Sequence, residues 1–189
     1  MVILAERHRD LSRAFEKLRV WATLPHAGYI VPTFGTSTLD GSPVTVGAAA
    51  TPETRQVLFI LSTTCPYCRA TLPVWERIAD SLRRVLTPRI EIYAISLDPV
   101  ESTLSYARAH RLSVPVLTFP ERKLMALYRT EVTPETIVLD GAGRVLYART
   151  GLLDGAAVVD SVLRAATSLP RRASALPSSL SAPVAGGSW

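Results

Sequence analysis

The sequence has few of the residues that build metal centres. Among 189 residues there are two cysteines, two methionines and three histidines. The histidines (His8, His26 and His110) lie in three unrelated segments, and no pair of them has metal-ligand spacing. A closed zinc site needs four ligands, of which the two cysteines could supply half. We therefore expect no metal and no other cofactor.

The two cysteines, Cys65 and Cys68, are also too few and too close together to staple the fold. A disulfide across so short a loop would stabilise the protein by only about 2 kcal/mol. A chain of this length can bury a hydrophobic core without such help. With 48% apolar and 20% charged residues, the composition is that of an ordinary globular protein.

Long apolar runs are absent as well. No stretch of about 18 apolar residues occurs, so the sequence predicts no transmembrane helix. The first ten residues, MVILAERHRD, hold five apolar residues in a row before the charges begin, which is too short for a signal peptide. Two interpretations remain open: a cytoplasmic protein, or a chain from which an export segment has been left out.

Clusters of positive charge are missing too. The net charge is +5 and the isoelectric point about 9.6, but the arginines are scattered and no run of five Lys or Arg residues occurs. A nucleic-acid interface needs basic residues gathered on one face, with aromatic residues among them. We therefore expect no nucleic-acid partner.

The pattern divides the chain into three parts. We expect residues 1–31 to form an amphipathic helix with a linker and residues 32–169 to form a folded domain. Residues 170–189 are rich in Pro, Ser and Ala and should form a flexible tail. In the first part, apolar residues recur at helical spacing between residues 4 and 20: Leu4, Leu11, Phe15 and Leu18. We favour a helix packed on the domain; the alternative is a stalk that follows a membrane anchor.

The first half of the domain predicts a hairpin and then two buried strands around a helix. The stretch FGTSTLDGSPVTV alternates apolar and polar residues around Asp40-Gly41, a strong hairpin signal. Residues 57–61 are continuously apolar, as in a strand covered on both faces. Apolar residues then recur at 3.6-residue spacing up to residue 85, and residues 89–97 form the second strand.

The second half predicts a helix from Asp98 to about His110, with Asp98 as its N-cap. A strand at 115–120, a short helix at 121–129, a hairpin at 136–150 and a C-terminal helix at 155–169 follow. A right-handed crossover should make the first two buried strands parallel. The predicted fold class is therefore α/β, with a central mixed sheet flanked by helices and an added N-terminal β-hairpin.

Cys65 stands where a buried strand ends and a helix begins. Unpaired backbone N–H groups and the helix dipole favour a thiolate at such a position. A thiol with a pKa near 8.5 is about 3% ionised at pH 7, whereas one with a pKa near 7 is half ionised. Pro66 suits the first helical position, and Arg69 adds positive potential. Because Cys68 lies one turn further on, the pair predicts a redox-active dithiol.

From about residue 32 to residue 169 the chain resembles the thioredoxin superfamily. Within it, the chain is similar to the membrane-anchored periplasmic thiol–disulfide oxidoreductases of the TlpA and ResA type, with the MauD-type proteins of methylamine utilisation as cousins. The resemblance rests on TLDG, LFILSTTCPYCRATLP and VTPETIVLDGAGRVLY. It implies a thioredoxin-like fold in which Cys65 and Cys68 are catalytic.

The resemblance also implies a substrate-binding region beside the dithiol. The Thr133–Pro134 bond is expected to be cis, and Thr133 to offer backbone groups to a substrate peptide. Pro66 and Tyr67, between the cysteines, are expected to support the site and tune its redox potential. The motif TPET occurs twice, at 51–54 and 133–136, but only the second copy precedes a predicted strand–turn–strand.

Three positions depart from the family pattern. Thr64 replaces the tryptophan that often precedes the first cysteine, Phe59 the buried acid of thioredoxin, and Thr71 the glutamate of ResA-type proteins. Both proton-handling carboxylates are therefore missing. The candidates for the group that accepts the Cys68 proton are water, Tyr67 and an acidic residue from another segment.

The leading hypothesis is an enzyme that reduces or exchanges disulfides of extracytoplasmic client proteins. The resemblance implies an upstream thiol–disulfide electron donor, a periplasmic location and possible membrane tethering in the full-length protein. One alternative is a peroxiredoxin-like thiol peroxidase: Ser62 fits the pattern of those enzymes, but Leu58 stands where they have proline. Another is a non-catalytic binding module or metallochaperone whose dithiol carries Cu(I) or Zn(II).

Overall fold

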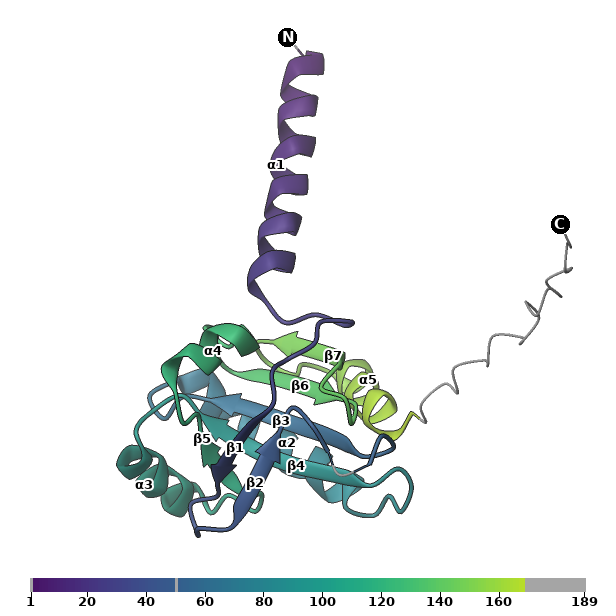
Figure 1. Ribbon diagram of the computed structural model, residues 1–189. Coiled ribbons are helices and arrows are strands. Elements are labelled where there is room, and N and C mark those ends of the chain that lie inside the picture. Colours follow the sequence, from purple (N-terminus) through teal and green to yellow (C-terminus); the bar gives the residue numbers. More distant parts are fainter. Residues whose placement is uncertain (1, 50, 169–189) are drawn as a thin grey trace, which may run out of the picture.

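The structure, a computed structural model, describes residues 2–49 and 51–168, and a five-stranded sheet forms its centre (Figure 1). The strands lie in the order β5-β4-β3-β6-β7. β3, β4 and β5 run parallel, whereas β6 and β7 are antiparallel to their neighbours. Their bounds are Arg55–Leu61, Ile90–Ser96, Val116–Thr118, Glu135–Leu139 and Val145–Thr150 for β3 to β7.

Different elements cover the two faces of this sheet. The crossover helices α2 (Pro66–Leu82) and α3 (Val100–His110) contribute to the same hydrophobic cluster as α5 (Ala156–Thr167). Right-handed crossovers between parallel strands place successive helices on one face. The opposite face is covered by α4 (Arg122–Tyr128) and by the hairpin of β1 (Phe34–Ser37) and β2 (Pro43–Val46).

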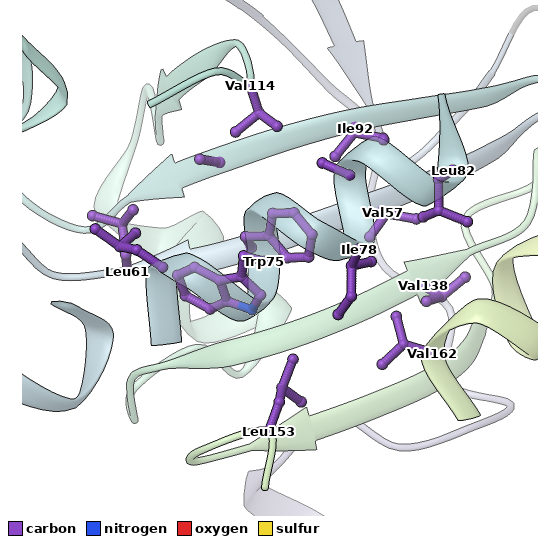
Figure 2. Close-up of a cluster of buried hydrophobic side chains, with 14 of the residues drawn as sticks. Val57, Leu61, Trp75, Ile78, Leu82, Ile92, Val114, Val138, Leu153 and Val162 are labelled. Carbon is purple, nitrogen blue, oxygen red and sulfur yellow. The ribbon is translucent and has the colours of Figure 1, made fainter. Parts of the chain in front are cut away.

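All seven residues of β3 are buried, because the strand is covered on both faces. Val57, Phe59 and Leu61 enter the cluster under α2, while alternate residues enter the opposite cluster. Figure 2 shows the first cluster, in which Trp75 of α2 lies over the sheet. The Trp75 ring stacks on Phe59 at 5.1 Å, and its Nε1–H donates to Thr136 Oγ1 at 2.9 Å. The core therefore fixes the position of α2 on the sheet.

Gln56 connects the N-terminal hairpin to the central sheet. Its side-chain oxygen accepts from the backbone N–H of Gly47 at 2.9 Å. Its amide nitrogen donates to Thr45 O at 2.8 Å and to a carboxylate oxygen of Glu91 at 3.0 Å. Buried backbone groups need such partners, so this one fully buried side chain satisfies groups on two elements.

Arg55, the first residue of β3, is another buried polar side chain. Its guanidinium donates to the carbonyl oxygens of residues 52, 53 and 54. It also donates to Ser168 O, just after α5, at 3.0 Å. The interaction joins the last described turn of the chain to the start of the central strand.

The fold predicted from the sequence is confirmed: a mixed sheet flanked by helices, with a separate N-terminal hairpin. The hairpin turns at Asp40-Gly41, where Gly41 has a φ of 90°. The boundaries of the three parts stay a prediction. The predicted tail, residues 170–189, lies outside the described residues.

The prediction that the N-terminal helix packs on the domain is wrong. The helix α1 spans Val2–Thr23 and extends away from the sheet (Figure 1). Leu11 is 70% exposed and Phe15 is 68% exposed. Their helical spacing gives an apolar stripe, but the domain does not cover these two side chains. Within the described residues no helix is long and apolar enough to cross a membrane.

Glu135, the first residue of β6, is a buried carboxyl group. Its Oε1 accepts a hydrogen bond from Thr150 Oγ1 at 2.8 Å, while Oε2 has no partner among the described residues. Burial raises the pKa of Glu135 to about 8, although the hydrogen bond from Thr150 opposes the shift. The carboxyl group is therefore mostly protonated at neutral pH.

This burial makes the stability of the fold depend on pH. The native state keeps a proton that the unfolded chain loses near its ordinary pKa of 4.5, so stability should fall between that pH and about 8. Glu135→Gln keeps the neutral form and should be more stable than the wild type at pH 8 by roughly 3 kcal/mol. Urea unfolding of both proteins at pH 5 and pH 8 measures the difference. Exposed Glu131→Gln is the control, and an unchanged pH dependence in Glu135→Gln would contradict the assignment.

Candidate active site

Cys65 is the N-cap residue of α2. The chain leaves β3 at Leu61, and Cys65 has extended φ and ψ angles of −80° and 115° before the helix begins at Pro66. The backbone N–H of Cys68 donates to Cys65 Sγ at 3.4 Å. A proline at this first helical position costs nothing, since its missing N–H would have no partner within the helix. The local sequence therefore places the Cys65 sulfur over the first turn of α2.

The surroundings of Cys65 stabilise its thiolate. Burial alone would raise the pKa of this half-buried thiol. Hydrogen bonds from the Thr133 hydroxyl and from the backbone N–H groups of Cys68 and Tyr67 outweigh burial, so the pKa lies below its ordinary value of 9.0. The two backbone N–H groups belong to the first turn of α2, where the partial positive charge of the helix N-terminus also favours a thiolate. Cys65 can therefore serve as a nucleophile near neutral pH.

Cys68 lies in the opposite environment. It is completely buried in the cluster under α2. The backbone N–H of Ser62 donates to its Sγ at 3.5 Å, but burial dominates and raises the pKa of Cys68 to about 11. One thiol of the pair is thus prepared to attack, and the other stays protonated.

The predicted region around Thr133 lies beside the first cysteine. Cys65 Sγ donates to the backbone oxygen of Thr133 at 3.6 Å, and the Thr133–Pro134 bond is cis. The contact arises because β6 pairs with β3 antiparallel, which brings the start of β6 to the end of β3. Tyr67, between the cysteines, is 61% exposed. Cys65, Cys68 and Thr133 are thus brought together, with Pro66 and Tyr67 on the helix start beside them.

Asp98 has a different place from the one predicted. The N-cap of α3 is Pro99, which makes no side-chain capping bond. The Asp98 carboxylate instead accepts a hydrogen bond from the backbone N–H of Thr63 at 2.5 Å. The strand order places the ends of β3 and β4 side by side, so Asp98 supports the loop that leads to Cys65. Sequence spacing alone did not reveal this contact.

The two positions that lack the family's carboxylates hold side chains with other partners. Phe59 stacks on Trp75, and Thr71 donates its hydroxyl to Tyr67 O at 2.8 Å. Neither can take the proton of Cys68. Within residues 2–49 and 51–168, no group of three or more His, Cys, Asp and Glu side chains is arranged to hold a metal ion.

Comparison with known proteins finds relatives of two names, MauD and DsbE. The chain is 38% identical over 55 residues to the methylamine utilization protein MauD of Methylobacillus flagellatus, a match that covers 29% of this chain and 27% of that protein. It is 30% identical over 135 residues to a DsbE homolog, a thiol:disulfide interchange protein of Paracoccus denitrificans, covering 69% and 70% of the two chains. The chain thus covers well under two thirds of the MauD relative.

A solved structure agrees with the fold. A secreted disulfide oxidoreductase of Mycobacterium tuberculosis, homologous to E. coli DsbE, superposes with a TM-score of 0.54 at 20% identity, covering 70% of this chain and 94% of that one. The model of the AhpC/TSA family matches residues 27–148, more than half of the sequence. The chain therefore belongs to the AhpC/TSA family and, within it, to the TlpA/ResA type of thioredoxin-fold protein.

Proposed function

We propose that this protein exchanges thiols and disulfides with other proteins through Cys65 and Cys68. The observation that supports the proposal is the opposite environment of the two sulfurs. The pKa of accessible Cys65 is lowered, while burial raises the pKa of Cys68 to about 11. A nucleophile that can reach a client and a sheltered second thiol are what a two-step exchange requires.

The proposed reaction has two balanced steps. The Cys65 thiolate attacks one sulfur of a client disulfide, forms a mixed disulfide and releases the other client sulfur as a thiolate, which takes up a proton. Cys68 then loses its proton and attacks Cys65 Sγ, which forms the Cys65–Cys68 disulfide and releases the second client thiol. The two electrons of the dithiol have then passed to the client. An upstream thiol–disulfide donor would reduce the pair again.

The clients proposed are proteins outside the cytoplasm. The relatives support this location: one is called a thiol:disulfide interchange protein, and the solved M. tuberculosis structure is described as secreted. Disulfides persist in such compartments. Tethering of the full-length protein to a membrane belongs to the same proposal. Thr133 and Pro134 would face the client backbone, with Pro66 and Tyr67 shaping the surface beside it.

Peroxide reduction is a second candidate function, because the family match covers the AhpC/TSA family as a whole. An accessible Cys65 with a lowered pKa would suit a peroxidatic thiol as well. Leu58, however, stands where the peroxiredoxin pattern has proline, and it is a buried core residue of β3. We therefore place disulfide exchange first.

The roles of the two cysteines can be separated by substitution. Cys65→Ser should abolish reduction of insulin disulfides, because it removes the attacking sulfur. Cys68→Ser should retain the first step and accumulate a mixed disulfide, since nothing displaces the client. Turbidity measures insulin reduction, and non-reducing electrophoresis detects the mixed disulfide.

Two results would count against this assignment. Retained insulin reduction in Cys65→Ser would remove Cys65 from the mechanism. Rapid consumption of hydrogen peroxide by the wild type with a thiol donor, with no reduction of insulin, would reverse the order of the two candidate functions. Cys68→Ala is the control for the serine variant. It should accumulate the mixed disulfide as well, because the serine hydroxyl takes no part in the first step.

The lowered pKa of Cys65 and the raised pKa of Cys68 predict selective alkylation. With a limiting amount of iodoacetamide at pH 7.5, the reduced protein should be labelled at Cys65 well before Cys68, because the thiolate is the reactive species. Peptide mass spectrometry gives the two labelling rates over a range of pH. The Cys68 rate should still be rising at pH 10, and equal rates for both thiols at pH 7.5 would contradict the geometry.

The direction of electron flow can be measured as the reduction potential of the pair. We propose a reductant, so equilibration in defined thiol–disulfide buffers should give a value near that of thioredoxin, about −270 mV, or below. A potential near −120 mV would instead identify a donor of disulfides.

A further inference from the structure

The loop of residues 62–64, between β3 and α2, is bonded on both sides. The backbone N–H of Ser62 donates to Cys68 Sγ, the sulfur of the buried thiol, at 3.5 Å. The N–H of the next residue, Thr63, donates to the Asp98 carboxylate at 2.5 Å. Asp98 follows β4, which pairs with β3. Two successive amides of one short loop are thus fixed, one to the reacting centre and the other to the end of the neighbouring strand.

The Asp98 carboxylate is not used by the helix that follows it. An aspartate before a helix often caps it by accepting a hydrogen bond from the first turn. The N-cap of α3 is instead Pro99, whose side chain makes no capping hydrogen bond. The carboxylate bonds to the loop before the dithiol, so its role is to be found at that loop.

Asp98 is itself held in place by buried groups. Its backbone N–H donates to Ser96 Oγ at 3.2 Å, and the Thr103 hydroxyl of α3 donates to the same oxygen at 2.8 Å. Ser96 and Thr103 are each 1% exposed. The N–H of Leu97 donates to Leu61 O at 2.9 Å and extends the pairing of the two strands. A side chain supported by such bonds can hold a neighbouring loop in one position.

We propose that Asp98 is a positioning residue for the second step of the exchange. By holding the amide of Thr63, it keeps the preceding N–H, that of Ser62, directed at the Cys68 sulfur. This role rests on the proposed function, because it concerns the thiol that resolves the mixed disulfide. A neutral thiol is a weak acceptor, but once Cys68 loses its proton the same N–H makes a charge-assisted hydrogen bond. A donor already in place where the charge develops needs no rearrangement during the reaction.

The loop takes up no proton and forms no covalent bond in this step. Cys68 gives its proton to solvent, its thiolate attacks Cys65 Sγ, and the bond between Cys65 and the client sulfur breaks. The client thiolate that leaves takes up a proton. The donors around Cys65 lie elsewhere, on the first turn of α2 and at Thr133. Releasing the loop should therefore slow resolution much more than the first attack.

The test is Asp98→Ala, followed with the chromogenic disulfide DTNB in single-turnover reactions of the reduced protein. Attack by Cys65 releases the first chromophore, and resolution by Cys68 releases the second. In Asp98→Ala the second phase should be about 10-fold slower, because the Cys68 thiolate loses part of a charge-assisted hydrogen bond. The first phase should change by less than about twofold, since the bonds to the other sulfur are kept.

Asp98→Asn separates the position of the loop from the charge of the side chain. The amide oxygen of asparagine can accept the same hydrogen bond from Thr63 without a negative charge, so this variant should restore the second phase. Equal slowing in the asparagine and alanine variants would overturn the positioning role, because the charge would then be what matters. Should the alanine variant not accumulate, Asp98→Ser gives the same comparison, since its side chain ends one atom nearer the backbone.

Glu76→Ala is the matched control. Glu76 of α2 is half-buried like Asp98, and its carboxylate likewise accepts a hydrogen bond from a loop amide, the N–H of Ser113, at 3.0 Å. That loop leads into β5 and not to the dithiol. Both alanine variants should lose some stability in urea unfolding, but only Asp98→Ala should show slower resolution. An unchanged second phase in Asp98→Ala, equal slowing of both its phases, or the same slowing in Glu76→Ala would each contradict the inference.

A different result would overturn the proposed function itself. If the wild type releases one chromophore and never the second, Cys68 does not resolve a mixed disulfide on Cys65. The role of Asp98 would then fall with the mechanism on which it rests. Two-phase kinetics in the wild type, together with an unaltered Asp98→Ala variant, would reject the inference alone.

Discussion

The complete burial of β3 is the constraint on which the rest of the structure depends. Residues 57–61 of the strand lie alternately in the two hydrophobic clusters, and the strand pairs with β4 on one edge and β6 on the other. A strand enclosed in this way can present functional groups only where it ends. The chain turns there into α2, and Cys65 stands at the turn. The stability of the core and the position of the dithiol are therefore set by the same residues.

The same enclosure accounts for the difference between the two thiols. Residue 65 precedes the helix. The first backbone N–H groups there have no partner within the helix and can donate hydrogen bonds to a negatively charged group. Residue 68 is one turn later, on the face of α2 that packs against the sheet. A spacing of three residues is enough to carry the chain from the surface to the core. The amphipathic period of the helix, rather than any special ligand, separates a nucleophile from a protected thiol.

The sequence was informative where burial and backbone geometry leave a local pattern. The apolar run of β3, the Asp40-Gly41 turn and the helix start after Cys65 are each determined by neighbours in the sequence, and the order of strands and helices gave the fold class. The resemblance added Thr133 and its cis bond with Pro134, which no period in the sequence indicates.

Contacts between distant segments were not predictable in this way. Asp98 has the residue type and position of a helix N-cap, yet its carboxylate accepts a hydrogen bond from Thr63, 35 positions earlier in the chain. Tyr106 of α3 packs against the cluster that contains Cys68 because α3 lies on the same side of the sheet as α2. For α1, amphipathicity indicated an apolar stripe but could not say whether the partner of that stripe lies within the domain.

The buried guanidinium of Arg55 has a geometric consequence for the whole molecule. It holds Ser168 at the start of β3, while Cys65 follows the end of the same strand. Seven residues of extended chain separate these two points, a distance of about 20 Å. Ser168 therefore lies at the end of the domain opposite the two sulfurs, and any segment joined to it starts from that end. An attachment made at that end, to a surface, a reporter or another domain, would leave the redox face turned outward.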